Sequence, residues 1–232
     1  MARIIVMGGG VCGLTAGMLL TRDGHEVSIL ERDSDPVPAS AEEAWESWAR
    51  EGVIQFRQAH FLAAGGRAVL EETLPDVLDD LIGAGALRFD PIAGLPPEIA
   101  GRREGDERFV TFTARRPVIE QVLGTAAEGE PGLEVRRGSP VAGLIIDPRA
   151  GIPHVGGVRL EDGEALLADL VVDAMGRHSK LPRMLSDAGV GPIEEEVEDS
   201  GFIYYGRYFR SEDGSTPPNY GPLLAPSARS RS

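Results

Sequence analysis

A glycine-rich turn between a strand-like and a helix-like segment is the strongest constraint in this sequence. Residues 2–7 form a short β-branched run that predicts a buried strand, and the apolar pattern of residues 14–20 predicts a helix. Between them lie Gly8, Gly10 and Gly13, spaced as GxGxxG. In this spacing the first glycine permits a tight turn, the second lets a pyrophosphate approach the backbone, and the third lets helix and strand pack closely. The turn therefore predicts an anion site at the helix N-terminus.

The context of this turn matters because 30 of the 232 residues are glycine, so the spacing alone arises often by chance. A second strand-like run, residues 25–30, ends at Glu31, about 20 residues after the glycines. The Glu31 carboxylate would accept hydrogen bonds from adenosine ribose hydroxyls and repel a 2′-phosphate, which favours FAD or NAD over NADP. Arg32 could reach the adenine or the pyrophosphate. The alternative for the glycines is a turn that binds no ligand. The alternative for Glu31 is an exposed acid at the end of a strand, and that for Arg32 is a solvated arginine.

The rest of the chain alternates between strand-like and helix-like segments, which is typical of an α/β nucleotide-binding domain. Helices are predicted at residues 40–50, 64–84 with a break at Pro75, 116–127 and 179–188. Strands are predicted at residues 108–113, 133–147 with an interruption near Pro140, 154–167 as a hairpin, 170–174 and 200–209. Residues 85–105 are predicted to be rich in loops.

Charge and composition exclude several classes of partner. Lys and Arg number 23 against 37 Asp and Glu, and the formal charge of −14 would repel a nucleic acid backbone. No apolar run reaches the roughly 18 residues of a membrane span, and no metal-binding motif is present. The single cysteine cannot form an internal disulfide. The N-terminus begins with a strand-like run, and we expect no charged, cleavable leader. We therefore expect a cytoplasmic protein without a metal.

Five stretches in order resemble one family, the FAD-dependent oxidoreductases of the aromatic-hydroxylase type, whose members include single-component flavoprotein monooxygenases. The opening RIIVMGGGVCGLTAGMLLTRDGHEVSILERD is similar to that family's FAD-binding start. The other four stretches are GVIQFRQAHFL at 52–62, ARRPVIEQVL at 114–123, GSPVAGLII at 138–146 and LVVDAMGRHSKLPRML at 170–185. The resemblance implies a Rossmann-like three-layer FAD-binding domain over residues 1–190, with a mainly parallel sheet and a crossover β-hairpin.

The resemblance also implies further cofactor contacts. Arg116 would lie near the flavin phosphates, Val141 would present its backbone to the adenine, and Asp173 with Gly176 would close over the glycine turn. The alternatives are that Arg116 is a solvated arginine at a helix start, that Val141 is an ordinary strand residue and that Asp173 caps the following turn.

The stretch at 52–62 resembles the family segment that faces the flavin. Its polar residues Arg57, Gln58 and His60 could hold the ring edge or a substrate, although such residues are also common on surfaces or in packing contacts. Trp45 and Trp48 stand three apart on one predicted helix, a spacing that favours core packing over a cofactor site.

Two features depart from the family pattern. Met175 precedes Gly176, and Pro182 lies between Ser179 and Arg183, which alters the segment that contacts the nicotinamide in the hydroxylases. The family also continues through a complete substrate sheet to a Gly-Asp segment that holds the ribityl chain. We therefore expect residues 191–232 to form an incomplete β substrate domain with a disordered tail, and the sequence to be truncated.

The resemblance implies that NAD(P)H reduces FAD and that an oxygen atom is then transferred from O₂ to a small organic substrate. Because the cofactor carries this chemistry, no catalytic side chain is predicted. One alternative is a flavin-dependent reductase or halogenase, although Lys180 is the only lysine present. Another alternative is a non-catalytic remnant that binds an adenine dinucleotide. A homo-oligomer or a complementing chain is a further possible partner.

Overall fold

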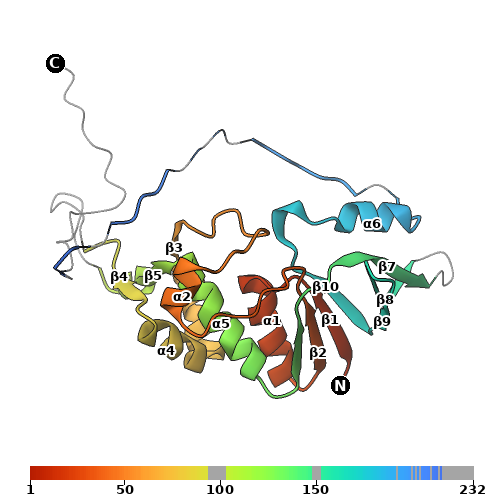
Figure 1. Cartoon of the computed structure of the whole chain (residues 1–232), viewed down its shortest axis with the longest axis horizontal. Coiled ribbons are helices and arrows are strands. Elements are labelled where there is room, and N and C mark those ends of the chain that lie inside the picture. Colours follow the sequence, from red (N-terminus) through yellow and green to blue (C-terminus); the bar gives the residue numbers. More distant parts are fainter. Residues whose placement is uncertain are drawn as a thin grey trace.

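The central sheet, sheet A, contains four parallel strands in the order β10-β1-β2-β6 (Figure 1). These strands are β1 (Arg3–Met7), β2 (Glu26–Leu30), β6 (Leu133–Arg136) and β10 (Leu170–Asp173). Met7 pairs with Leu30 on one side and with Asp173 on the other. The carboxyl ends of three strands therefore meet at one edge, which is where ligands bind in open parallel sheets.

The fold is known from a computed structural model. It describes residues 1–93, 103–147, 153–191, 193–199, 201, 203, 205–209, 211–213 and 215. The helices are α1 (Val11–Arg22), α2 (Ala41–Glu46), α3 (Ala64–Thr73), α4 (Pro75–Gly83), α5 (Arg116–Gly129) and α6 (Leu181–Asp187). Two 3₁₀ turns, η1 (Asp106–Phe109) and η2 (Gly176–His178), complete the described helical elements. None of these helices has the length and apolar character needed to cross a membrane.

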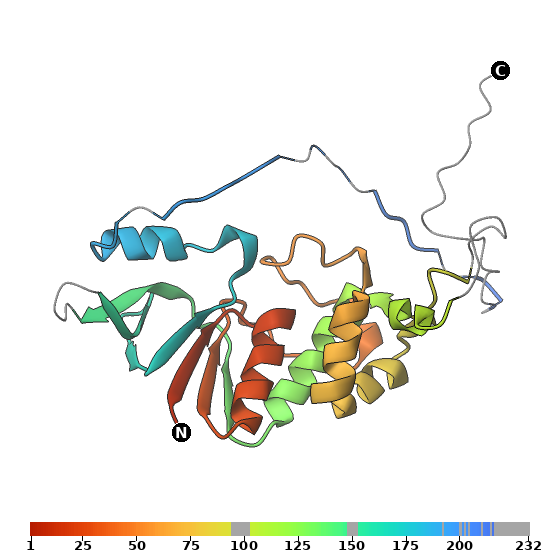
Figure 2. The same cartoon turned by 180° about the vertical axis from the view of Figure 1, so that it is seen from behind.

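Alternating side chains of β1 place sheet A between two other layers. Ile4 and Val6 face the larger core, which includes Leu14 and Met18 of α1 and the buried face of α5. Ile5 and Met7, one residue out of phase, face a second core formed with sheet C. This period-two burial is what a strand covered on both faces requires. The three-layer α/β fold predicted from the sequence is confirmed (Figure 2).

Sheet C is antiparallel and contains β7 (Val141–Asp147), β8 (His154–Leu160) and β9 (Ala165–Leu167). Its β8-β9 connection is the hairpin predicted at residues 154–167, and Gly163 adopts a φ of 93° in the turn. Val158 and Leu160 of β8 are buried against sheet A. Sheet C therefore covers the face of sheet A opposite α1 and α5.

Sheet B is a smaller antiparallel sheet in the order β3-β5-β4, with β3 (Ala59–Phe61), β5 (Thr111–Arg115) and β4 (Leu87–Phe89). The helices α3 and α4 lie between β3 and β4 in sequence, and Pro75 begins α4, which confirms the predicted break. The sequence pattern did not predict β3 and β4. Residues 94–102 of the predicted loop-rich region lie outside the described residues.

The predicted strand at 200–209 is not observed among its described residues, which are 201, 203 and 205–209. A strand needs a neighbour for its backbone hydrogen bonds, and these residues have none. The segment after α6 instead extends back toward β4, as both views show (Figures 1 and 2). There Tyr208 packs edge-to-face on Trp45, with ring centroids 4.7 Å apart. The predicted disordered tail lies largely outside the described residues.

Candidate dinucleotide-binding site

The glycine turn connects β1 to α1 at the carboxyl edge of sheet A. Gly8 has a φ of 108°, and its N–H donates to the Leu30 carbonyl at 2.8 Å. A Cβ on Gly13 would lie 1.9 Å from the Gly8 carbonyl oxygen, so only glycine permits this approach of helix and strand. A Cβ on Gly8 would lie 2.6 Å from the Ala174 carbonyl oxygen. The first and third glycines are therefore required by packing within the protein.

Gly10 is different because packing does not require it. It is the N-cap of α1, and a Cβ built on it would meet nothing within 4 Å. No side chain caps the helix, and its first turn contains no acidic residue. The first N–H groups of this 12-residue helix therefore have no side-chain cap, and they lie at the positive end of the helix dipole. These features fit the diphosphate predicted for this position.

Glu31 follows β2 directly and lies against the glycine turn. The residue is only 5% exposed. Its Oε2 accepts hydrogen bonds from the Gly9 N–H at 2.9 Å and from Arg50 Nη2 at 2.7 Å, and its Oε1 accepts from the Asp33 N–H at 2.9 Å. The alternative of an exposed strand-end acid is therefore wrong. A ribose hydroxyl bound here would share the carboxylate with Arg50.

Arg50 is the residue at this site that sequence reasoning missed. Its side chain is 2% exposed and donates from Nε to Asp33 at 2.8 Å, from Nη1 to Glu120 at 3.1 Å and from Nη2 to Glu31. Burial alone would lower the pKa of Arg50, but the negative charges of Glu120, Glu31 and Asp33, together with the hydrogen bond to Asp33, outweigh it and raise the pKa. Its planar fork of donors suits several carboxylates at once. No local motif surrounds Arg50, so the sequence offered no signal.

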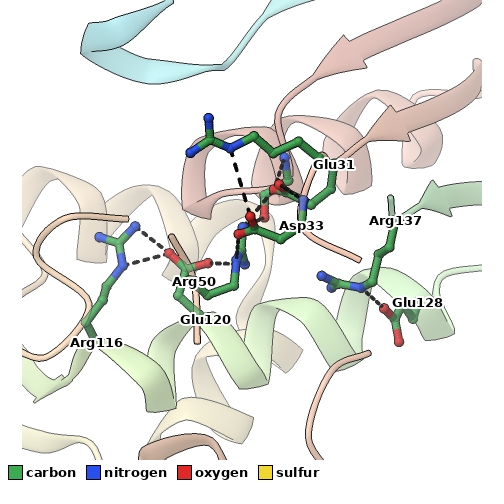
Figure 3. A network of polar contacts seen from close by, with 9 residues as sticks. Glu31, Asp33, Arg50, Arg116, Glu120, Glu128 and Arg137 are labelled. Carbon is green, nitrogen blue, oxygen red and sulfur yellow. Dashed lines mark hydrogen bonds and ion pairs between the residues drawn. The ribbon is translucent and has the colours of Figure 1, made fainter. Parts of the chain in front are cut away.

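Glu120 and Arg116 extend this network along α5 (Figure 3). Glu120 is fully buried and accepts from Arg116 Nε at 2.7 Å. The Arg116 side chain is 14% exposed, so the alternative of a solvated arginine is wrong. Its Nη1 lies 3.0 Å from His60 Nε2. The structure thus joins Arg116 to Glu31 through Glu120 and Arg50.

His60 lies on β3 and ends this chain of contacts. Burial and the charge of Arg116 lower the pKa of His60, and a hydrogen bond with the backbone of Gln58 opposes them in part. A guanidinium group can only donate hydrogen bonds, so His60 Nε2 is the acceptor and the ring is neutral. His60 therefore serves as a neutral acceptor for Arg116.

The remaining predicted residues lie around this network. The Arg32 side chain is 59% exposed, and its nearest acidic partner is Asp33 at 3.9 Å. Val141 begins β7 and pairs with Leu160. The structure does not bring either residue into the buried network, and their proposed adenine contacts stay predictions.

Asp173 ends β10 beside the glycine turn. Its Oδ1 accepts from the Met175 N–H at 2.9 Å and its Oδ2 accepts from Ser179 Oγ at 2.5 Å, so it caps the turn that follows. Gly176 lies in that turn with a φ of 78°. The turn packs on Gly8 through Ala174. A direct contact of Asp173 or Gly176 with a cofactor stays a prediction.

The segment from Trp45 to Gln58 packs on itself. Arg57 donates to the Trp48 carbonyl at 2.9 Å and stacks over the Trp45 ring, 5.2 Å from its centroid. Trp48 is buried against Phe56, as predicted for a core residue, whereas Trp45 is only half-buried. The helix ends at Glu46, so the two tryptophans do not share a helical face. Arg57 thus has a packing role, which was one of its two predicted readings.

A hollow of about 590 Å³ lies where the C-terminal segment meets α2. Its lining residues are Glu42, Trp45, Glu46, Arg115, Tyr208 and Phe209. Burial raises the pKa of Tyr208, opposed by the charge of Arg115. Within the described residues there is no cluster of three or more His, Cys, Asp or Glu side chains suited to a metal.

Comparison with known proteins places the glycine turn in a recognised family of domains. Residues 6–57 match the NAD(P)-binding Rossmann-like domain. Protein Rv3254 of Mycobacterium tuberculosis is 30% identical over 90% of this chain and 45% of its own length. Kynurenine 3-monooxygenase of Salinispora tropica is 28% identical over 79% of this chain and 38% of its own length. Zeaxanthin epoxidase of Nicotiana plumbaginifolia is 27% identical over 88% of this chain and 28% of its own length.

Solved structures give the same result for the fold. PqsL, described as a probable FAD-dependent monooxygenase from Pseudomonas aeruginosa, superposes with a TM-score of 0.57 at 22% identity, over 84% of this chain and 46% of that one. A variant of 2-methyl-3-hydroxypyridine-5-carboxylic acid oxygenase superposes with a TM-score of 0.54 at 23% identity, over 80% of this chain and 42% of that one. The predicted resemblance to flavoprotein monooxygenases is confirmed. The chain spans less than half the length of these relatives.

Proposed function

We propose that this chain binds FAD by its adenosine diphosphate half and forms the cofactor-binding part of a monooxygenase-type oxidoreductase. The observation that carries the proposal is the open space at Gly10, in front of the uncapped N-terminus of α1 and beside the buried acid Glu31. The sequence similarity to kynurenine 3-monooxygenase and zeaxanthin epoxidase supports the reaction class.

Each part of the site has a separate role in this proposal. The N–H groups of the first turn of α1 bind the diphosphate, and the absence of a side chain at Gly10 lets it approach them. Glu31 accepts hydrogen bonds from the ribose, and its negative charge disfavours a 2′-phosphate. Arg50 holds the Glu31 carboxylate and prevents its burial without a partner.

The finer parts of the proposal concern the reaction. A bound flavin supplies the redox chemistry, with NAD(P)H as the reductant and oxygen transfer to a small organic substrate as the result. The single cysteine of the sequence supports a cytoplasmic location.

The single cysteine also provides a direct test of the site. Cys12 is exposed in the first turn of α1, so a thiol reagent labels only this position. We expect FAD and ADP to slow the alkylation of Cys12 in proportion to their occupancy, because the diphosphate would cover the turn. Adenosine, which lacks the diphosphate, is the control ligand. Labelling that is unaffected by saturating FAD would contradict the proposal.

A second measurement separates an enzyme from a dinucleotide-binding remnant. Protein reconstituted with FAD and freed of excess cofactor is mixed anaerobically with NADH or NADPH, and the flavin absorbance is followed. Bleaching of the flavin absorbance supports the oxidoreductase. In air and without an organic substrate, the rate of NAD(P)H consumption then gives the rate of uncoupled turnover. Retained flavin that neither cofactor reduces would favour the remnant.

A further inference from the structure

Glu120 is an acid that neither the sequence motifs nor the proposed ligand contacts explain. It lies on α5 with no exposed surface, in a position where an unpaired carboxylate would be strongly disfavoured. Two arginines from different segments satisfy it: Arg116 bonds Oε1 and Arg50 bonds Oε2. Each oxygen thus fixes one guanidinium group. Glu120 is therefore the carboxylate that contacts both arginines.

The contacts on either side of Glu120 form a continuous path between two sheets, and Figure 3 shows its part from Glu31 to Arg116. On one side Arg50 Nη2 contacts Glu31 at 2.7 Å and the Gly9 carbonyl at 3.3 Å, both at the carboxyl edge of sheet A. On the other side Arg116 Nη1 contacts His60 Nε2 at 3.0 Å, in sheet B. Each step is a direct ion pair or hydrogen bond.

The largely buried charges along this path are unequal in number. Three carboxylates, Glu31, Asp33 and Glu120, face two guanidinium groups, Arg50 and Arg116, and the exposed Arg32 lies 3.9 Å from Asp33. A ribose hydroxyl that bonds Oε2 of Glu31 competes with Arg50 Nη2 for that oxygen. Because the guanidinium group is planar and rigid, a change at Nη2 also moves Nη1 relative to Glu120.

We propose that Glu120 is a positioning residue that transmits occupancy of the dinucleotide site, through Arg50 and Arg116, to His60 in sheet B. The proposal rests on the proposed function, because a ribose at Glu31 is what shifts Arg50. When Arg50 loses part of its contact with Glu31, it neutralises Glu120 more fully. Arg116 is then less well neutralised, and its charge acts more strongly on the His60 ring.

The groups around His60 make the direction of this effect clear. Arg116 of α5 is the charged residue in contact with the ring, Gln58 of the preceding loop meets it through its backbone, and β5 places Ala114 opposite it. A stronger positive field disfavours the imidazolium form. Binding of ADP or FAD is therefore expected to lower the pKa of His60 further.

The test is a proton NMR titration of the histidine C2–H signals, with and without saturating ADP. The sequence has four histidines, and His60→Gln identifies the signal of interest. We expect ADP to lower the pKa of His60 in the wild type and to leave it unchanged in Glu120→Gln. The matched control is Glu128→Gln on the same helix, whose partly exposed carboxylate pairs with Arg137 outside this path. It should keep the wild-type response.

Protection of Cys12 by ADP is measured on the same samples, so that the two proposals fail differently. Protection without any change at His60 in the wild type would overturn the coupling and leave the dinucleotide site intact. An equal response in Glu120→Gln would also overturn the role of Glu120. Absence of protection in the wild type would overturn both proposals. If Glu120→Gln does not fold, Arg116→Gln replaces it; we expect this variant to raise the pKa of His60 and to remove the ADP response.

Discussion

Gly10 and Gly13 lie in the same turn, but packing within the protein restricts only Gly13 to glycine. A methyl group on Gly13 would collide with the Gly8 carbonyl, whereas one on Gly10 would enter open space. Gly10 also has a φ of −84° and a ψ of −177°, which alanine adopts without strain. One glycine therefore serves the fold and the other is free to serve a ligand.

Alanine at these two positions should separate stability from binding. We expect Gly13→Ala to lower the free energy of unfolding by about 3 kcal/mol, because backbone atoms must move. We expect Gly10→Ala to stay within about 1 kcal/mol of the wild type and to weaken FAD binding by at least about tenfold. Urea denaturation and flavin fluorescence titration measure the two effects. Unchanged FAD affinity in Gly10→Ala would show that the diphosphate lies elsewhere.

The half-buried ring of His60 should give folding a specific pH dependence. Its pKa is lowered from the ordinary value of 6.5, so the unfolded chain takes up a proton at a pH where the folded ring stays neutral. This contribution to stability is complete above about pH 6.5 and is lost as the pH falls toward the folded pKa. We expect His60→Gln to lose less stability than the wild type between about pH 7.5 and about pH 5.5.

Urea denaturation at the two pH values measures this difference. His154→Gln, at an exposed residue of β8, is the control and should behave as the wild type does. An equal loss of stability in His60→Gln and the wild type would show that another group dominates this range.

Sequence reasoning found the local part of the site and missed the part made by long-range contacts. Gly8, Gly10, Gly13 and Glu31 follow a spacing set by one strand-helix-strand unit, so the pattern is visible in the sequence. Arg50 and Glu120 are 70 residues apart and have meaning only as a pair. Glu120 also lies on the buried face of α5, where an apolar residue is normally expected.

At the scale of elements, an ion cluster joins the last residue of α1, the first turn of α4 and the residue that follows α5. Arg22 at the end of α1 forms a two-pronged contact with Asp76 of α4, at 3.0 and 2.7 Å, and also bonds Glu130 after α5. The hydrogen bond from Arg22 lowers the pKa of Asp76 below its ordinary value of 3.8, although burial opposes this. The cluster holds α4 against the pair of helices that covers sheet A.

Removal of the Arg22 charge should have a modest, salt-dependent effect because Asp76 is 59% exposed. We expect Arg22→Met to lower the free energy of unfolding by about 1 kcal/mol at low ionic strength. In 1 M salt, where the screening length is about 3 Å, most of this difference should disappear. Arg183→Met, which removes an exposed pair within α6, is the control and should have little effect at either salt concentration. A loss that is independent of salt would indicate packing by the Arg22 stem instead.

The elements themselves were predictable where the signal is local. Pro75 marked the start of α4, and Glu161, Asp162 and Gly163 marked the β8-β9 turn. The strands β3 and β4 have three residues each and exist because β5 lies between them, so no periodicity could develop. The segment 201–209 is the opposite case. Its composition is typical of a strand, but no partner strand for it is present among the described residues.

At the scale of the whole molecule, charge works against the proposed ligand. The chain has a formal net charge of −14, and the buried network has one more carboxylate than guanidinium groups. The attraction for a diphosphate comes from backbone dipoles at the start of α1, which act within the first turn. An approaching dinucleotide therefore meets repulsion over most of its path and attraction only at the end.

This arrangement predicts that salt should speed the binding of FAD. Added salt shortens the screening length from about 30 Å at 0.01 M to about 8 Å at 0.15 M, which weakens the long-range repulsion before it affects the close contacts. We expect the association rate constant of FAD, measured by stopped-flow quenching of flavin fluorescence, to rise severalfold over this range. Anion sites built on exposed lysine and arginine clusters show the opposite trend. A rate that falls with salt would therefore indicate a long-range positive field at the site. The dipole of α1 acts only at short range, and the paired arginines are neutralised, so neither would explain such a field.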